Sequence, residues 1–163
     1  MKISLSKPEL NKKDIRVILN ALKSGWLTHG PENLKFENAF RKKIGTKYAI
    51  SMNSCTSALE CSLKVLEKKG EVIIPSWTWV STANAILNSG NSPVFADVDL
   101  ESRNITADEI EKKITKKTIA VIVVHYAGLM CDMGPIVKLL KKHKLDLIED
   151  SAECLGATYK KQQ

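Results

Sequence analysis

The 163-residue chain carries 25 Lys and Arg against 18 Asp and Glu, which gives a formal net charge of +7, and 44% of its residues are hydrophobic. This composition is typical of one ordinary globular domain and excludes a disordered, collagen-like or low-complexity chain. The longest apolar run, residues 119–124, is too short to cross a bilayer, and the N-terminus has no apolar signal region. We therefore expect a cytoplasmic protein with no membrane partner.

The surplus of lysine does not indicate a nucleic-acid partner. The lysine pairs at 112–113, 116–117 and 141–142 fall on expected polar helix faces and turns, without the interleaved aromatic residues of a base-stacking platform. The cysteines show neither a CxxC pair nor the Cys/His spacing of a metal site, so we expect no metal. They are interpreted as reduced, mostly buried thiols: Cys55, Cys61, Cys131 and Cys154.

The first quarter of the chain is predicted to be helical. Asn11 and Asp14 resemble a capping box, and the apolar residues that follow recur at helical spacing, which predicts an amphipathic helix over residues 12–23. A Gly-Pro pair then opens a second expected helix, from residue 31 to about residue 45.

From residue 48 onward, short apolar runs alternate with segments of helical period. The expected strands are residues 48–52, 72–74, 93–95, 119–124 and 145–148, and the expected helices are residues 56–67, 79–88, 106–114 and 132–143. This alternation predicts right-handed crossovers and a three-layer α/β/α fold with a mostly parallel sheet. Ligands of such sheets bind outside the carboxyl ends of the strands, so the residues just after each strand are the first to consider.

A run of small residues, NSCTSAL at 53–59, leads from the first expected strand into a helix. Free backbone N–H groups and the helix dipole at such a turn can bind a phosphate or carboxylate, with the hydroxyl groups of Thr56 and Ser57 as further donors. Ser and Thr also cap helices without binding any ligand. The run matches neither a Walker loop nor a GxGxxG dinucleotide turn.

Two of the three tryptophans follow the second expected strand. Trp77 and Trp79 flank Thr78 at the start of a helix whose other residues are small. A tryptophan in this place can belong to the core, or it can offer a flat face to a planar ring.

Three carboxylates, Glu149, Asp150 and Glu153, follow the last expected strand. Their burial is costly unless a cation meets them. A metal ion is one candidate, but the nearest histidine in this pattern, His125, is more typical of a hydrogen-bonded core residue. A protonated ring nitrogen is the better partner for Asp150, because a carboxylate beneath it keeps a heteroaromatic ring charged and electron-withdrawing.

A phosphate cup, a flat aromatic face and a buried carboxylate together meet the needs of pyridoxal phosphate (PLP). Strings that carry these features occur in the order and spacing of the DegT/DnrJ/StrS-type sugar aminotransferases: SGWLTHGP, NSCTSAL, PSWTWVSTANAIL, PVFADVD, VHYAGLMCDM and IEDSAECLGATYK. The chain resembles this family over essentially its whole length. The resemblance implies the large domain of the aspartate-aminotransferase fold, fold type I.

The resemblance also implies roles for particular residues. Thr56 and Ser57 match the residues that hold the cofactor phosphate, and Trp79 matches the aromatic residue that stacks on the pyridine ring. Asp150 matches the carboxylate that pairs with the ring nitrogen. Glu153 falls where many relatives have Gln or His near the phenolic oxygen, and a glutamate there would have to be protonated or otherwise paired.

The family moves an amino group from glutamate to a keto-sugar carried on a nucleoside diphosphate, which makes amino sugars for surface polysaccharides and other products. The resemblance therefore implies nucleotide-sugar and glutamate substrates and a homodimer with sites at the subunit interface. Residues 26–31 match a loop near the substrate pocket. An active-site lysine of the family holds the cofactor as a Schiff base and shuttles a proton.

In the family that lysine follows the IEDSAECLGATYK string, and no lysine of this chain matches its position. We expect residues 1–163 to comprise an N-terminal helical segment and the first part of the PLP-binding large domain, without the rest of that domain and the small C-terminal domain. The favoured explanation is a fragment that is inactive alone. The alternatives are a non-catalytic phosphoryl-ligand-binding or regulatory module, and a relative of the sugar dehydratases of this fold that use histidine in place of the lysine.

Overall fold

Two helices near the N-terminus form where the sequence places their start and stop signals. The computed structural model describes residues 7–161, and within it the two helices are α1 (Lys12–Ser24) and α2 (Pro31–Ile44). The side chain of Asn11 accepts the N–H of Asp14, and the Asp14 carboxylate accepts the N–H of Asn11. Gly25 ends α1 with a φ of 71°, a left-handed conformation that glycine adopts without strain. Both predicted helices are confirmed.

The chain divides into two compact units at the junction of Ser51 and Met52. The second unit contains all the strands of the described chain. Its elements are α3 (Cys55–Lys64), β1 (Glu71–Pro75), α4 (Val80–Asn88), β2 (Ser92–Ala96), α5 (Ala107–Glu111), β3 (Thr118–Val124), the 3-10 helix η1 (Tyr126–Gly128), α6 (Met133–His143) and β4 (Asp146–Asp150). Among residues 7–161, no helix is long and apolar enough to span a membrane.

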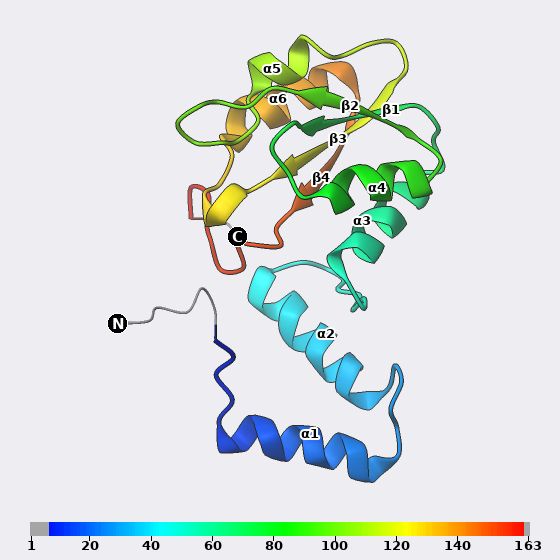
Figure 1. The fold of residues 1–163 in the computed structure, drawn as a ribbon, viewed down its shortest axis with the longest axis vertical. Coiled ribbons are helices and arrows are strands. Elements are labelled where there is room, and N and C mark those ends of the chain that lie inside the picture. Colours follow the sequence, from blue (N-terminus) through cyan, green and yellow to red (C-terminus); the bar gives the residue numbers. More distant parts are fainter. Residues whose placement is uncertain (1–6, 162–163) are drawn as a thin grey trace. The chain divides into compact units, whose positions relative to one another are not determined.

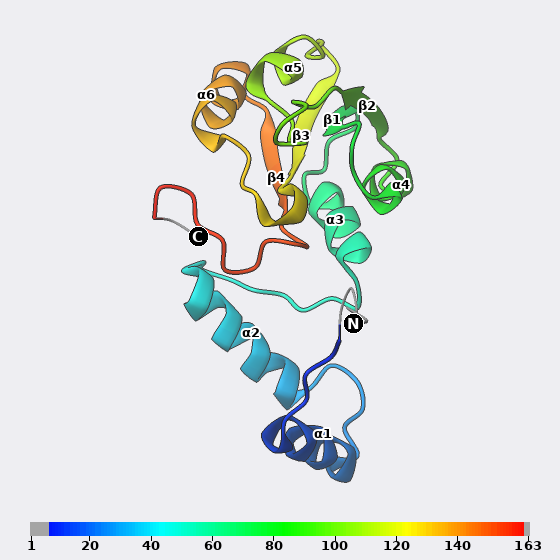
Figure 2. The same cartoon turned by 60° about the vertical axis from the view of Figure 1, so that its left-hand side comes forward.

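The strands form one sheet in the order β2-β1-β3-β4, and every pairing in it is parallel. Helices α3 and α4 cover one face of this sheet, and α5 and α6 cover the other (Figures 1 and 2). The prediction of a three-layer α/β/α fold with a mostly parallel sheet is confirmed.

The central strands are buried on both faces, as their continuous apolar runs indicate. Val72 and Ile74 of β1 belong to the cluster packed against α3 and α4, whereas Ile73 belongs to the cluster packed against α5 and α6. Strand β3 alternates in the same way, because successive side chains of a strand point to opposite faces. Burial on both faces holds these strands in place, and it therefore also sets the positions of their carboxyl ends.

The strand predicted over residues 48–52 is wrong. This segment has no regular structure, and Tyr48 and Ile50 are exposed. Its backbone groups are bound by side chains: the Thr46 hydroxyl donates to the carbonyl of Tyr48 at 2.9 Å, and the N–H of Ser51 donates to the Glu37 carboxylate at 2.8 Å. Side chains that bind these groups compete with strand pairing.

The prediction of mostly buried thiols is correct for only half of the cysteines. Cys131 and Cys154 are buried, whereas Cys55 and Cys61, both on α3, are exposed. The spacing of apolar residues on α3 points Leu59 and Leu63 inward and leaves both of its cysteines outside the core.

Candidate functional site

A cavity of about 640 Å³ opens at the carboxyl-terminal edge of the sheet. Four segments line it: the start of α3, the loop from β1 into α4, the end of β3 with η1, and the end of β4 with the residues after it. The lining residues are Cys55, Thr56, Ser76, Trp77, Thr78, Trp79, Ser81, Val124, Tyr126, Asp150, Ala152 and Glu153. The structure thus brings together four of the predicted site residues, Thr56, Trp79, Asp150 and Glu153, and leaves Ser57 outside the lining.

Asp150 is the last residue of β4, and only 7% of its surface is exposed. Its Oδ1 atom accepts two hydrogen bonds, from the N–H of Ala152 at 3.1 Å and from the thiol of Cys55 at 3.6 Å. No described residue donates to the other oxygen, Oδ2. A nearly buried carboxylate with one oxygen left for a ligand is suited to a cationic N–H donor.

The start of α3 provides backbone donors. Ser54 is the N-cap, and its Oγ accepts the N–H of Ser57 at 3.1 Å. The hydroxyl groups of Ser54 and Ser57 also lie 3.0 Å apart, so Ser57 takes part in the cap. Within the described chain, the N–H groups of Cys55 and Thr56 have no acceptor. These two groups lie at the positive end of the helix dipole, where an anion binds favourably.

Three aromatic side chains, Trp77, Trp79 and Tyr126, line the cavity. Trp79 immediately precedes α4 and is 78% exposed, so its ring is not part of the core. Trp77 lies edge-to-face with Tyr126, with ring centroids 6.0 Å apart and an interplanar angle of 75°. The sequence left open whether these tryptophans belong to the core or offer a flat face to a planar ring. Their exposure favours the second alternative.

Glu153 has a hydrogen-bond partner in the structure. Its Oε2 accepts the N–H of Ala127 at 2.8 Å, and Ala127 has a positive φ of 52°. This bond fastens the segment after β4 to the turn after β3. A backbone donor therefore stabilises the Glu153 carboxylate in the described chain.

His125 is a core residue, with 1% of its surface exposed. Its Nδ1 accepts the N–H of Cys131 at 3.2 Å, so the ring proton resides on Nε2, which lies 3.1 Å from Oε2 of Glu149 and donates to it. Both ring nitrogens are thus occupied. Among residues 7–161, no group of three or more His, Cys, Asp or Glu side chains could hold a metal ion.

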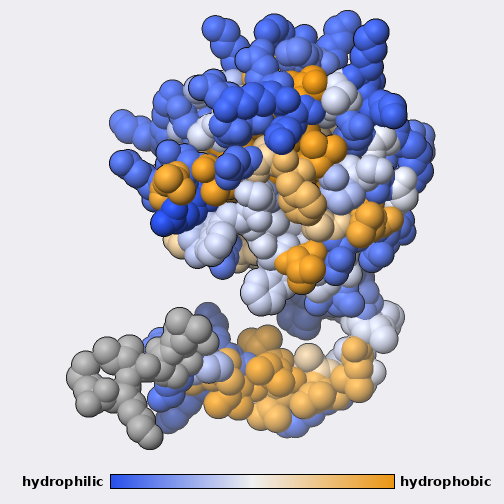
Figure 3. All heavy atoms as spheres, turned by 45° about the horizontal axis from the view of Figure 1, so that its top comes forward, coloured by the Kyte–Doolittle hydropathy of each residue, from blue (hydrophilic) through white to orange (hydrophobic). Residues whose placement is uncertain are grey.

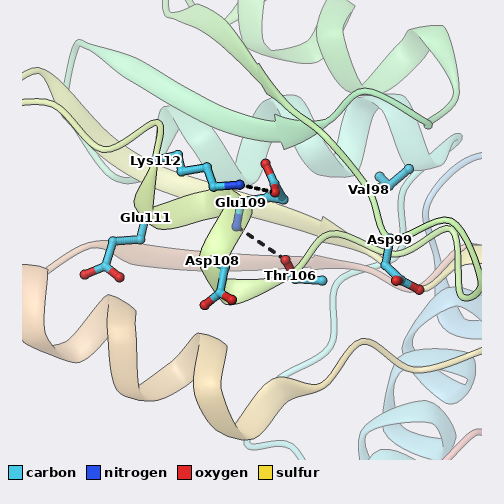
Figure 4. Close-up of a pocket in the computed structure, with 7 residues that line it drawn as sticks. All are labelled: Val98, Asp99, Thr106, Asp108, Glu109, Glu111 and Lys112. Carbon is cyan, nitrogen blue, oxygen red and sulfur yellow. Dashed lines mark hydrogen bonds and ion pairs between the residues drawn. The ribbon is translucent and has the colours of Figure 1, made fainter.

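A second cavity, of about 560 Å³, lies beside α5 and is lined largely by acidic residues (Figure 4). Glu109 pairs with Lys112, and Glu111 pairs with Lys142 of α6. The carboxylates of Asp99, Asp108 and Glu111 point in different directions in Figure 4. They do not converge on one point, so this cavity is a weaker candidate for a binding site than the cavity at the carboxyl-terminal edge of the sheet.

Curated relatives match almost the whole chain. An uncharacterized protein of Methanocaldococcus jannaschii is 46% identical over 156 residues, which cover 94% of this chain and 40% of the relative. The spore coat polysaccharide biosynthesis protein SpsC of Bacillus subtilis is 40% identical over 157 residues, which cover 95% of this chain and 40% of the relative. The chain therefore spans about 40% of the length of these relatives.

Solved structures of the same architecture superpose closely. PseC of Helicobacter pylori, an aminotransferase involved in the biosynthesis of pseudoaminic acid, is 35% identical with a TM-score of 0.93, over 100% of this chain and 45% of PseC. The Escherichia coli GDP-4-keto-6-deoxy-D-mannose-3-dehydratase, solved with bound hydrated PLP, is 25% identical with a TM-score of 0.90, over 98% of this chain and 43% of the dehydratase. A family model also matches residues 8–163, and the chain belongs to the DegT/DnrJ/EryC1/StrS aminotransferase family.

Proposed function

We propose that this chain is the cofactor-cradling part of a PLP-dependent aminotransferase, which transfers an amino group from glutamate to a nucleotide-linked keto-sugar in amino-sugar or surface-polysaccharide biosynthesis. Its likeness to SpsC, a polysaccharide biosynthesis protein, and to PseC, an aminotransferase, supports this proposal. In it, residues 1–163 supply the N-terminal helical segment and the first part of the PLP-binding large domain. The rest of that domain and the small C-terminal domain belong to the full-length, homodimeric enzyme.

The observation that carries the proposal is the Asp150 carboxylate, nearly buried at the cavity with Oδ2 free. PLP, when bound, supplies a pyridinium ring that withdraws electrons from the carbon undergoing reaction. Asp150 would accept the ring N–H and keep that nitrogen protonated. The aromatic face of Trp79, in the same lining, would stack on the ring.

The start of α3 would hold the phosphate. Donors for it are the backbone N–H groups of Cys55 and Thr56 and the hydroxyl of Thr56, which lines the cavity. The N–H of Ser57 is already bound by Ser54, so Ser57 would contribute only its hydroxyl, accepting from Ser54 while donating to the phosphate. Glu153 would approach the phenolic oxygen with one of its oxygens already bound to Ala127.

Among the described residues that line the cavity there is no lysine. In the proposal, the lysine that holds the cofactor and moves the proton comes from the remainder of the full-length enzyme. The likeness to the E. coli dehydratase favours a second candidate, a sugar dehydratase with histidine at the lysine position. A non-catalytic module that keeps the cradle is the third. The residue at the lysine position of the full-length protein distinguishes the three: lysine, histidine, or neither.

A binding titration tests the cradle directly. We expect pyridoxamine 5′-phosphate, which needs no covalent anchor, to bind the wild-type chain and to bind Asp150→Asn about 10- to 100-fold more weakly, the value of a charge-assisted hydrogen bond. Asp146→Asn is the matched control, because Asp146 lies at the opposite end of the same strand and pairs with Lys68. Equal affinity of the two variants would contradict the proposed role of Asp150.

Covalent labelling provides an independent check. Borohydride reduction of the chain in the presence of PLP is expected to leave no stoichiometric adduct, because no lysine among the described residues lines the cavity. Peptide mass spectrometry would locate any adduct. A single, stoichiometrically labelled native lysine would contradict this assignment.

A further inference from the structure

Cys55 lies at the first position of α3 and contacts a residue 95 positions further along the chain. Its sulfur is 3.6 Å from Oδ1 of Asp150, and both residues line the same cavity. The N–H of Ala152 donates to the same oxygen at 3.1 Å. Two donors from two separate segments therefore meet on one oxygen of the carboxylate.

The terminal torsion of an aspartate side chain is soft, so an unrestrained carboxylate turns through a broad range. Here a donor from α3 and a donor from the segment after β4 both hold Oδ1. A rotation of the carboxylate would break both hydrogen bonds at once. The arrangement fixes the carboxylate plane and leaves Oδ2 as the oxygen available to a ligand.

We propose that Cys55 is a positioning residue for Asp150: its thiol, together with the N–H of Ala152, holds Oδ1 so that Oδ2 is presented to the protonated ring nitrogen of the ligand. The identity of that ligand rests on the proposed function. The contact between Cys55 and Asp150 does not, and it is testable without any ligand.

The ionisation state of the thiol suits this role. Partial burial and the negative charge of Asp150 raise the pKa of the Cys55 thiol above its ordinary value of 9.0. Cys55 therefore stays protonated at neutral pH and can donate. A thiolate in the same place would repel the carboxylate instead of holding it.

The first test uses the ligand-free chain. Alkylation by iodoacetamide is followed across pH, and peptide mass spectrometry separates Cys55 from Cys61, the exposed cysteine on the same helix. We expect Asp150→Asn to lower the pH midpoint at which Cys55 reacts, because the substitution removes the negative charge beside the thiol. A midpoint for Cys55 that Asp150→Asn leaves unchanged would overturn the proposal.

The second test measures the effect on binding. Cys55→Ala is expected to weaken the binding of pyridoxamine 5′-phosphate about three- to tenfold, the value of one hydrogen bond. Cys55→Ser, which keeps a donor, should restore most of the affinity, and Cys61→Ala should leave it unchanged. Circular dichroism and unfolding midpoints of the three variants check that each is folded. Wild-type affinity in Cys55→Ala, or no rescue by serine, would overturn the positioning role.

The two tests separate this inference from the function on which it rests. A wild-type chain that shows the Asp150-dependent alkylation midpoint but does not bind pyridoxamine 5′-phosphate would overturn the proposed function and support the Cys55–Asp150 contact. Binding that depends on Asp150 but not on Cys55 would support the proposed function and overturn the inference.

Discussion

The imidazole of His125, at the end of β3, donates from Nε2 to Oε2 of Glu149, on the edge strand β4, at 3.1 Å. Its other nitrogen accepts the N–H of Cys131 at 3.2 Å. The ring thereby ties both ends of the turn over residues 125–131 to the sheet. This turn carries Tyr126, which lines the cavity, and Ala127, which binds Glu153.

Replacing His125 with alanine removes both hydrogen bonds and leaves a cavity in the core. We expect a loss of about 2–4 kcal/mol in the free energy of unfolding, measured by urea denaturation. His143→Ala, at the exposed end of α6, is the control and should cost less than about 1 kcal/mol. Equal losses in the two variants would show that the buried ring does not stabilise the turn.

Cys131 should make stability depend on pH in the alkaline range. Burial raises the pKa of its thiol from 9.0 to about 12. The folded protein therefore holds this proton more tightly than the unfolded chain does, so the contribution is complete below pH 9.0 and is lost as the pH rises towards about 12. The loss is at most about 1.4 kcal/mol per pH unit.

The measurement is the urea midpoint of the wild type and of Cys131→Ala at several alkaline pH values. Lysine and tyrosine titration is common to both proteins, so the difference between their slopes isolates the thiol. We expect a shallower decline in the variant. Parallel slopes would contradict the raised pKa.

The hydrogen bonds that Glu37 accepts should depend on pH in the acidic range. The N–H and hydroxyl of Ser51 donate to its carboxylate, both at 2.8 Å, and His29 lies 3.3 Å away. The backbone hydrogen bond from Ser51, followed by those from the Ser51 hydroxyl and His29, lowers the pKa of Glu37 below 4.5. The interaction is therefore present above pH 4.5 and is lost as the pH falls through the lower folded value.

The amide resonance of Ser51 gives a direct readout by NMR. Its chemical shift is expected to titrate with a midpoint below 4.5 in the wild type and to lose this transition in Glu37→Gln. A Ser51 transition at or above the ordinary glutamate value, or one that persists in the variant, would contradict the hydrogen bond.

The apolar face of α1 is expected to promote self-association. Its large side chains are about half exposed, and hydrophobic atoms cover much of the visible face of the N-terminal unit in Figure 3. These side chains are Ile15, Ile18, Leu19 and Leu22. Contiguous apolar surface of this kind drives association in water.

Leu22→Lys should lower the weight-average mass in sedimentation at a given protein concentration. Asn20→Lys adds the same charge on the opposite side of the helix and is the matched control. If both substitutions reduced association equally, net charge and not the apolar face would be responsible.

The sequence predicts elements well where local and long-range signals agree. The Asn11 capping box and Gly25 mark both ends of α1, and the apolar run at residues 119–124 becomes β3, one of the two central strands. The run at residues 48–52 has strand-like composition, yet it has no regular structure, and the side chains of Thr46 and Glu37 bind two of its backbone groups. Apolar content alone does not say whether a neighbouring strand is present.

The contacts within the site are harder to predict than its location. The chain order of the motifs indicates which loops meet at the edge of the sheet. It does not indicate that Cys55 donates to Asp150, or that the two nitrogens of His125 bind Cys131 and Glu149. These pairings depend on side-chain rotamers and on the register of β3 with β4, and neither has a local sequence signal.

Within residues 7–161, strand β4 lies at an edge of the sheet and pairs only with β3, yet it carries the carboxylate of the candidate site. Elements with fewer buried contacts open locally at a lower free energy than core strands do. A ligand bound to Asp150 would oppose that detachment, because any state with β4 released has lost the binding oxygen. Slower amide hydrogen exchange along β4 would thus accompany ligand binding, and the ligand would stabilise the pairing of β4 with β3.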